Sequence, residues 1–95
     1  MRKPNLSKYT VFQQKVYRAI LKIPSGQVLT YGEVANLIGK PKAARAVGRA
    51  LAANQDAPNI PCHRVVGYND IGGYSADGGI KGKLKLLKKE GFIYG

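Results

Sequence analysis

The sequence contains one cysteine and one histidine, and they are neighbours: Cys62 and His63. A cysteine thiol becomes a strong nucleophile when a neighbour lowers its pKa or removes its proton, and histidine is the commonest base for this step. A carboxylate can orient the histidine in turn. The acidic side chains are few: Glu33, Asp56, Asp70, Asp77 and Glu90. The residue types present therefore allow a thiol nucleophile, a base and an orienting acid.

Adjacency alone is weak evidence for this chemistry, because neighbouring side chains of a strand point to opposite faces. Contact between Cys62 and His63 requires a turn, which Pro61 favours. The alternative is that Cys62 is a small buried hydrophobe beside a structural histidine, and spacing alone favours this alternative. A single Cys excludes an intramolecular disulfide, and one Cys with one His cannot supply a structural zinc site. We therefore expect no metal and no cofactor.

The chain is short and strongly basic. Its 95 residues carry 16 Lys and Arg against 5 Asp and Glu, which gives a formal net charge of +11. This length predicts a single domain over residues 1–95, with a flexible tail over residues 1–8. The charge makes a polyanion the leading partner.

Several classes of protein are not favoured by the composition. No run of eighteen apolar residues is present, so we expect no membrane span. The first ten residues lack the apolar region of a secretory signal. A lone free thiol is typical of a reducing compartment, so we expect the cytoplasm, or the nucleus in a eukaryote. We also expect a monomer.

Hydrophobic periodicity and capping patterns predict a mainly helical domain with short strands. Thr10, followed three residues later by Gln13, forms a capping-box pattern at the start of a helix over residues 10–22. A short extended segment is expected at residues 28–30. Three apolar residues at helical spacing mark a last helix that ends at residue 90: Ile80, Leu84 and Leu87.

Two further helices are predicted in the middle of the chain. Thr30 and Glu33 form a second capping box, and Gly39 occupies the position of a C-terminal cap. Pro41 is placed to open a helix over residues 42–53, which consists of small residues and two arginines. Two helices joined by a tight glycine-containing turn are typical of a helix-turn-helix, whose second helix faces nucleic acid. We therefore expect a winged-helix-like helix-turn-helix DNA-binding domain.

Five motifs in order resemble one protein family. Residues 60–66 (IPCHRVV) look like a buried turn running into a short strand, and resemble the active-site motif of the O6-alkylguanine-DNA alkyltransferases, the methylated-DNA–protein-cysteine methyltransferases. Residues 26–35 are similar to this family's entry into the first helix of the helix-turn-helix. Residues 41–48 are similar to its recognition-helix signature. Residues 73–75 and 86–91 match in order and spacing, and five ordered motifs are far more specific than any one of them.

The resemblance implies a protein that moves an alkyl group from O6 of a damaged guanine onto its own cysteine, once. Cys62 matches the nucleophile, His63 the residue that relays its proton through a water, and Glu90 the carboxylate that orients the histidine. This is the logic of an activated-nucleophile triad, applied to displacement at an alkyl carbon. Tyr31 matches the phenol that donates toward guanine N3. The carbonyl of Val65 would accept a hydrogen bond from the exocyclic amine of guanine. The backbone amide of Ser75 would donate to O6, and Tyr74 would form part of the pocket wall.

The resemblance also implies how the lesion is reached. Because O6 of a stacked guanine lies inside the duplex, the nucleotide must be flipped out. Arg45 matches the finger that fills the vacated place, and Asn54 matches the hinge between the recognition helix and the active-site segment. The family lays this helix in the minor groove of double-stranded DNA, where small residues allow close approach. The expected DNA-contacting residues are Lys42, Ala43, Ala44, Arg45, Ala46, Gly48 and Arg49.

Alternatives remain at this point. A related group, the alkyltransferase-like proteins, binds the same lesions without transfer and carries Trp where this chain has Cys62. A third interpretation is a thiol enzyme that does not act on DNA. Arg49 stands where the family usually has a small residue, and the loop at residues 75–79 is longer and more acidic than the usual turn. The lysines of residues 81–89 are expected to form a solvated face.

Overall fold

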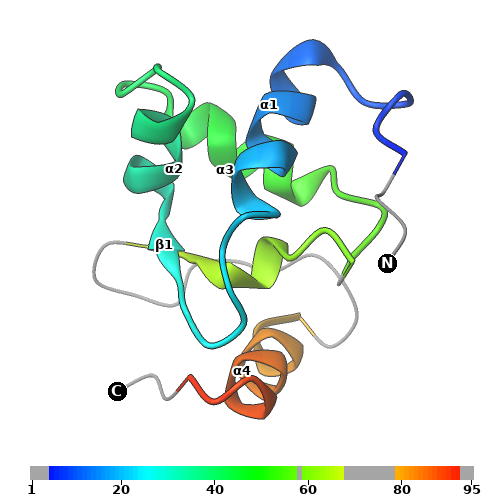
Figure 1. Ribbon diagram of the computed structural model, residues 1–95, viewed down its shortest axis with the longest axis vertical. Helices are drawn as coiled ribbons and strands as arrows, with labels where there is room; N and C mark the ends of the chain where they lie inside the picture. Colours follow the sequence, from blue (N-terminus) through cyan, green and yellow to red (C-terminus); the bar gives the residue numbers. More distant parts are fainter. Residues whose placement is uncertain (1–4, 58, 68–78, 93–95) are drawn as a thin grey trace.

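The computed structural model describes residues 5–57, 59–67 and 79–92 (Figure 1). In this part of the chain, helices predominate and two very short strands form one sheet. The elements follow in the order α1 (Val11–Ile20), β1 (Leu29–Thr30), α2 (Tyr31–Leu37), α3 (Ala44–Ala52), the 3₁₀ turn η1 (Cys62–Arg64), β2 (Val65–Val66) and α4 (Gly79–Lys89). The predicted class, mainly helical with short strands, is confirmed.

Helix α1 begins where the capping box predicted. The Thr10 hydroxyl accepts from the Gln13 amide at 3.1 Å, and the Gln13 side chain accepts from the Thr10 amide at 2.9 Å. These two bonds satisfy N–H groups that have no partner within the helix. The helix ends at Ile20, two residues before the predicted end.

Helices α2 and α3 form the predicted helix-turn-helix. Thr30 and Glu33 make the second capping box, and Gly39 has a φ of +76° after the end of α2, a backbone conformation that glycine adopts without a steric cost. The predicted start of α3 at residue 42 is wrong, because the helix begins at Ala44. Pro41 and Lys42 lie in a turn instead, which the Ala43 amide closes by donating to the Lys40 carbonyl at 2.9 Å.

The core lies between α1, α2 and α3 and extends to η1, the turn that contains Cys62. Its fully buried residues include Val16, Tyr17, Ile20, Val34, Val47, Ile60 and Val65. Strands β1 and β2 pair in parallel, with Leu29 beside Val65 and Thr30 beside Val66. Figure 1 shows this small sheet and η1 between the three-helix cluster and α4. The sheet thus brings the start of α2 to the strand that follows Cys62.

The buried face of α4 differs from the predicted one. Leu87 is buried, but Ile80 and Leu84 are 50% and 39% exposed. Lys83, four residues before Leu87 and therefore on the same face, is fully buried. The expectation that the lysines of residues 81–89 are all solvated is therefore wrong at this position. Nowhere in the described residues is there a helix both long enough and apolar enough to span a membrane.

Candidate active site and nucleic-acid interface

The turn that the sequence required at Cys62 is present. The Cys62 amide donates to the Ile60 carbonyl at 2.8 Å, and the Arg64 amide donates to the Pro61 carbonyl at 3.0 Å. This 3₁₀ geometry buries two successive side chains, since Cys62 is 7% exposed and His63 is 1% exposed. Both therefore face the interior, as a thiol and base working together require.

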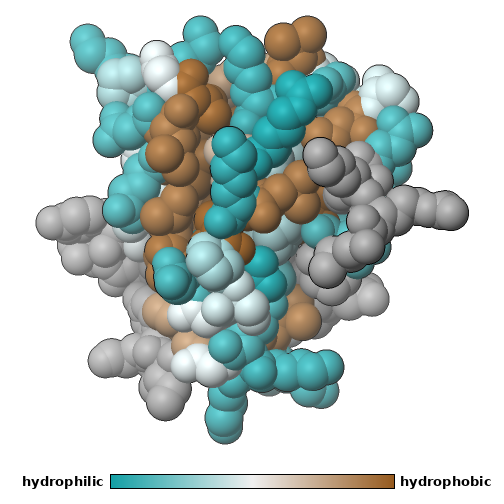
Figure 2. Space-filling model, in the orientation of Figure 1, coloured by the Kyte–Doolittle hydropathy of each residue, from teal (hydrophilic) through white to brown (hydrophobic). Residues whose placement is uncertain are grey.

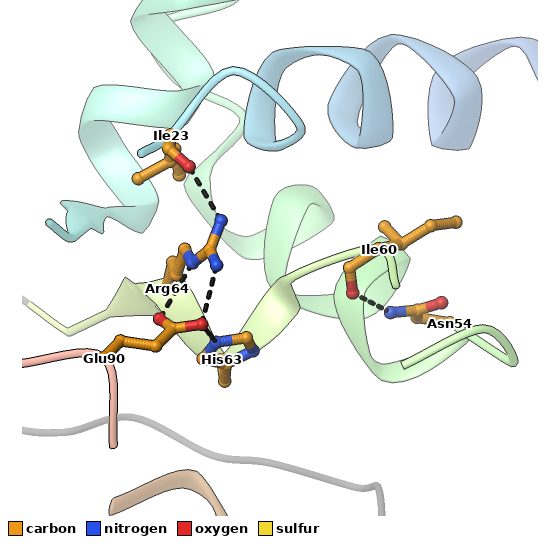
Figure 3. A network of polar contacts seen from close by, with 6 residues as sticks. All are labelled: Ile23, Asn54, Ile60, His63, Arg64 and Glu90. Carbon is orange, nitrogen blue, oxygen red and sulfur yellow. Dashed lines mark hydrogen bonds and ion pairs between the residues drawn. The ribbon is translucent and has the colours of Figure 1, made fainter. Parts of the chain in front are cut away.

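His63, Arg64 and Glu90 form one network, in which the side chains converge on the carboxylate (Figure 3). The Nε2 atom of His63 lies 3.0 Å from Oε2 of Glu90. Arg64 binds the same carboxylate with two N–H groups, at 2.9 Å to Oε1 and 2.6 Å to Oε2, and a third N–H donates to the Ile23 carbonyl at 2.8 Å. The predicted pairing of His63 with Glu90 is therefore present. The role of Arg64 was missed, although its place in the 60–66 motif was a signal.

The charge states in this network decide where the histidine proton lies. Hydrogen bonds from Arg64 hold the pKa of Glu90 below its usual value, so the carboxylate is ionised at neutral pH. Burial lowers the pKa of His63, and this outweighs the opposing effect of Glu90. A neutral imidazole that donates from Nε2 to a carboxylate keeps a lone pair on Nδ1. This Nδ1 atom is buried and has no hydrogen-bond partner among the described residues.

The thiol of Cys62 is not a pre-formed thiolate. Burial raises its pKa, while a hydrogen bond from the Asn54 side chain and the nearby Lys83 ammonium act in the opposite direction. The thiol is therefore protonated at neutral pH, and a nucleophilic step requires a base to accept its proton. The free Nδ1 lone pair of His63 is such a base.

Asn54, predicted as the hinge, follows the end of α3 and binds the segment that leads to Cys62. Its Nδ2 donates to the Ile60 carbonyl at 2.9 Å (Figure 3), and its Oδ1 accepts from the Asp56 amide at 2.8 Å. An amide nitrogen carries two hydrogens, so the same group can also donate to the Cys62 sulfur. Asn54 thereby fixes the segment before Cys62, and its side chain favours the ionised form of the thiol by lowering the pKa of Cys62 against the effect of burial.

Lys83 is a second residue that sequence reasoning missed. Its Nζ donates to the Val65 carbonyl at 2.6 Å, the carbonyl that was predicted to accept from guanine. A carbonyl oxygen has two lone pairs, so it can accept a second hydrogen bond. The positive charge of Lys83 lowers the pKa of both Cys62 and His63. The signal was its spacing of four residues from the buried Leu87.

Of the other predicted pocket residues, the structure describes only Tyr31. Tyr31 is the first residue of α2, half-buried against the edge of the core and directly after β1. Since Thr30 pairs with Val66, Tyr31 follows β1 at the same end of the sheet as Val66. Tyr74 and Ser75, predicted as the pocket wall and the O6 donor, lie outside the described residues.

Helix α3 has one buried and one basic exposed face. Val47, Ala50 and Leu51 are buried, whereas Arg45 and Arg49 are exposed. Lys42 is exposed just before the helix, and the predicted small residues Ala43, Ala44, Ala46 and Gly48 are half-buried. A Cβ placed on Gly48 would meet nothing within 4 Å. Figure 2 shows hydrophilic residues interspersed with hydrophobic ones in the upper half of the molecule, and further hydrophilic residues at its lower end.

Comparison with known proteins agrees with this geometry. A family model described as the DNA-binding domain of 6-O-methylguanine DNA methyltransferase matches residues 11–92. The chain belongs to this family. A probable methylated-DNA–protein-cysteine methyltransferase of Acanthamoeba polyphaga mimivirus is 52% identical over 83 residues, which cover 87% of this chain and 54% of the relative. The chain spans about half the length of the curated relatives that it matches most strongly.

The fold of this chain is similar to those of two proteins whose solved structures contain DNA. The Mycobacterium tuberculosis protein OGT in complex with DNA has 49% sequence identity and a TM-score of 0.82, and the match covers 86% of this chain and 50% of that one. Atl1 of S. pombe, in complex with damaged DNA containing O6-carboxymethylguanine, has 37% identity and a TM-score of 0.69, covering 84% of this chain and 75% of that one. The helix-turn-helix fold is thereby confirmed.

Proposed function

We propose that this chain is a DNA-repair alkyltransferase that moves an alkyl group from O6 of guanine in double-stranded DNA onto Sγ of Cys62, once per molecule. The observation that carries this proposal is that the buried Cys62 and His63 meet the Glu90 carboxylate, while Nδ1 of the histidine has no hydrogen-bond partner within the described part of the chain. The relatives named methylated-DNA–protein-cysteine methyltransferase support the same chemistry.

The proposed reaction balances with the groups at this site. His63 accepts the thiol proton, directed by Glu90, and Sγ of Cys62 attacks the alkyl carbon as the carbon–O6 bond breaks. Guanine leaves as an anion, which the phenol of Tyr31 stabilises by donating toward N3. The thiol proton finally passes to guanine, so that the products are a thioether and an intact guanine. No step regenerates the thiol, which limits each molecule to one turnover.

Access to O6 requires the nucleotide to leave the stack. We propose that α3 enters the minor groove with Arg45 as the residue that fills the vacated place, and that the protein acts as a monomer. Arg45 and Arg49 are both exposed and lie four residues apart, and they support this placement because residues at this spacing share one helix face. The carbonyl of Val65 and the amide of Ser75 would hold the flipped base.

The principal test is intact mass spectrometry after incubation with duplex DNA that contains O6-methylguanine. We expect the protein mass to rise by one methyl group, once, with the group located on Cys62. The variant Cys62→Ala is the control, and it should keep lesion binding but show no mass increase. If the methyl group stays on the DNA under single-turnover conditions, the proposed reaction is wrong.

The second candidate is a lesion-binding protein without transfer; Atl1, in complex with damaged DNA, is 37% identical, but the relatives at 52% and 47% identity are named methyltransferases and do not favour this candidate. Binding to alkylated DNA by the unmodified protein, together with an unchanged mass, would support it. The presence of a buried thiol at position 62 beside an available base argues for the enzyme. A thiol enzyme that does not act on DNA would show no preference for lesion-bearing DNA.

A further inference from the structure

Tyr9 lies far from Cys62 in the sequence but is attached to the loop that leads to it. Its hydroxyl donates to Oδ2 of Asp56 at 2.5 Å and accepts from the Gln55 amide at 3.0 Å. The ring is 7% exposed and packs edge-on against Tyr17, with the ring centroids 4.6 Å apart. One phenol therefore joins the segment before α1 to two consecutive residues of the loop after α3.

The N-terminal segment reaches this position through further contacts. The Tyr9 amide donates to the Leu6 carbonyl at 3.0 Å, and Leu6 packs against the core. The ammonium of Lys8 lies 3.2 Å from Oδ2 of Asp56. The described part of the expected tail, residues 5–8, is thus attached to the domain. Hydrogen bonds from Tyr9 and Lys8 lower the pKa of Asp56, so its carboxylate is a charged acceptor at neutral pH.

The backbone of Asp56 makes two hydrogen bonds that connect it to the active site, one to Asn54 and one to Ile60. Its amide donates to Oδ1 of Asn54 at 2.8 Å, which leaves the Nδ2 end of Asn54 turned toward the Ile60 carbonyl, two residues before Cys62. Its carbonyl accepts from the Ile60 amide at 2.9 Å, two residues before Cys62. The orientation of the Asn54 amide therefore depends on where Asp56 lies.

We propose that Tyr9 is a positioning residue for alkyl transfer: with Asp56 as its partner, it fixes the loop of residues 54–57 so that the Asn54 amide faces the Cys62 sulfur. As the thiol gives up its proton and develops negative charge, an N–H already aimed at the sulfur stabilises that charge without reorganisation. A loop released from Tyr9 would let the Asn54 amide rotate or retreat. Because this role rests on the alkyl transfer proposed above, the first measurement needs no DNA.

The decisive variant is Tyr9→Phe, which keeps the buried ring and its contact with Tyr17 but removes both hydrogen bonds of the hydroxyl. The rate of Cys62 alkylation by iodoacetamide is measured against pH on the full chain. We expect the midpoint for Tyr9→Phe to lie higher than that of the wild type, by up to about one pH unit, the size of one ordinary hydrogen bond. Transfer from DNA should slow roughly three- to tenfold.

Coupling to Asn54 separates a positioning role from general loss of structure. In an Asn54→Ala background, adding Tyr9→Phe should change neither the midpoint nor the transfer rate, because the group through which Tyr9 acts is gone. The variant Asp56→Asn keeps an acceptor for the phenol and should retain most of the rate, whereas Asp56→Ala should behave like Tyr9→Phe. Equal effects of Asn and Ala at position 56 would count against the proposal.

Tyr17→Phe is the matched control. It also removes one buried hydroxyl, whose hydrogen bond to the Ala50 carbonyl is 2.5 Å long, but it leaves the loop of residues 54–57 untouched. We expect a lower melting temperature and an unchanged thiol midpoint. A midpoint for Tyr9→Phe equal to that of the wild type, or an additive effect in the Asn54→Ala background, overturns the role of Tyr9. If Tyr9→Phe shifts the thiol midpoint but the wild-type protein transfers no alkyl group from DNA, the proposed function is overturned instead.

Discussion

Gly48 offers a test in which folding and DNA binding should respond in opposite directions. It lies inside α3, and a Cβ at this position would meet no atom of the described residues within 4 Å beyond its chain neighbours and the backbone of its own helix. Gly48→Ala therefore adds a methyl group without an internal clash. Glycine inside a helix is about 0.8–1.0 kcal/mol less favourable than alanine. We expect the variant to be more stable by about this amount, which raises the melting temperature of a domain this size by about 4–8 °C.

The same methyl group should weaken DNA binding, because Gly48 lies three residues after the exposed Arg45, on the same side of α3. If this face lies against the floor of a groove, an added methyl group costs about 1–3 kcal/mol through overpacking. The dissociation constant would then rise roughly 5- to 150-fold. Fluorescence anisotropy with a lesion-bearing duplex at fixed salt measures this change, beside a thermal melt of the free protein.

The matched control is Gly32→Ala in α2. Its Cβ would lie 3.9 Å from the Thr30 hydroxyl, which is an ordinary contact, so the substitution tests the same chemical change on another helix. We expect DNA affinity within a factor of two or so of the wild type. Two results would refute the reasoning: a Gly48→Ala protein that melts lower, or one that melts higher and binds DNA as tightly as the wild type. The latter would show that α3 does not meet the DNA through this face.

Three further predictions concern the alkylated form, pH and salt. Methylation of Cys62, which is 7% exposed within the core cluster, should destabilise the protein by about 1–3 kcal/mol and lower its melting temperature; equal melting temperatures before and after transfer would contradict this. Because burial lowers the pKa of His63 below its ordinary 6.5, the transfer rate should hold as pH falls through 6.5 and decline only below it. Over the same range the free energy of unfolding should fall, since the unfolded chain takes up a proton that the folded histidine resists; single-turnover rates and denaturant melts at several pH values check both. Arg49→Ala should reduce the slope of log affinity against log salt by about one if Arg49 contacts a phosphate, and an unchanged slope would place it off the DNA.

The capping boxes made the helix starts of α1 and α2 predictable, because their hydrogen bonds join residues only three apart. The start of α3 was not predictable in the same way. No side chain caps it, and Pro41 suits a turn as well as a first helical position. Local patterns thus located helices where the decisive interaction is local.

The contacts of the site residues join distant parts of the chain, so local sequence patterns did not predict them. The prediction that His63 pairs with Glu90 came from the resemblance to a family, since a sequence separation of 27 residues hides the contact from any periodicity. Lys83 was missed because a lysine in a basic run is usually solvated, and its burial depends on the Val65 carbonyl from a distant strand. Tyr9 and Asp56 belong to no motif, and only the folded chain brings them together.

The position of Glu90 depends on three segments that meet at the end of α4. Arg64 supplies two hydrogen bonds to the carboxylate and is itself held by the Ile23 carbonyl, in the loop after α1. Gly26, in the same loop, has a φ of +90°, and a Cβ there would come within 3.0 Å of the Glu90 carbonyl. The loop thus contacts both the backbone of Glu90 and the arginine that binds its side chain. Since the Glu90 carboxylate keeps the proton of His63 on Nε2, the lone pair that the proposed base carries on Nδ1 is set partly by a loop that contributes no catalytic group.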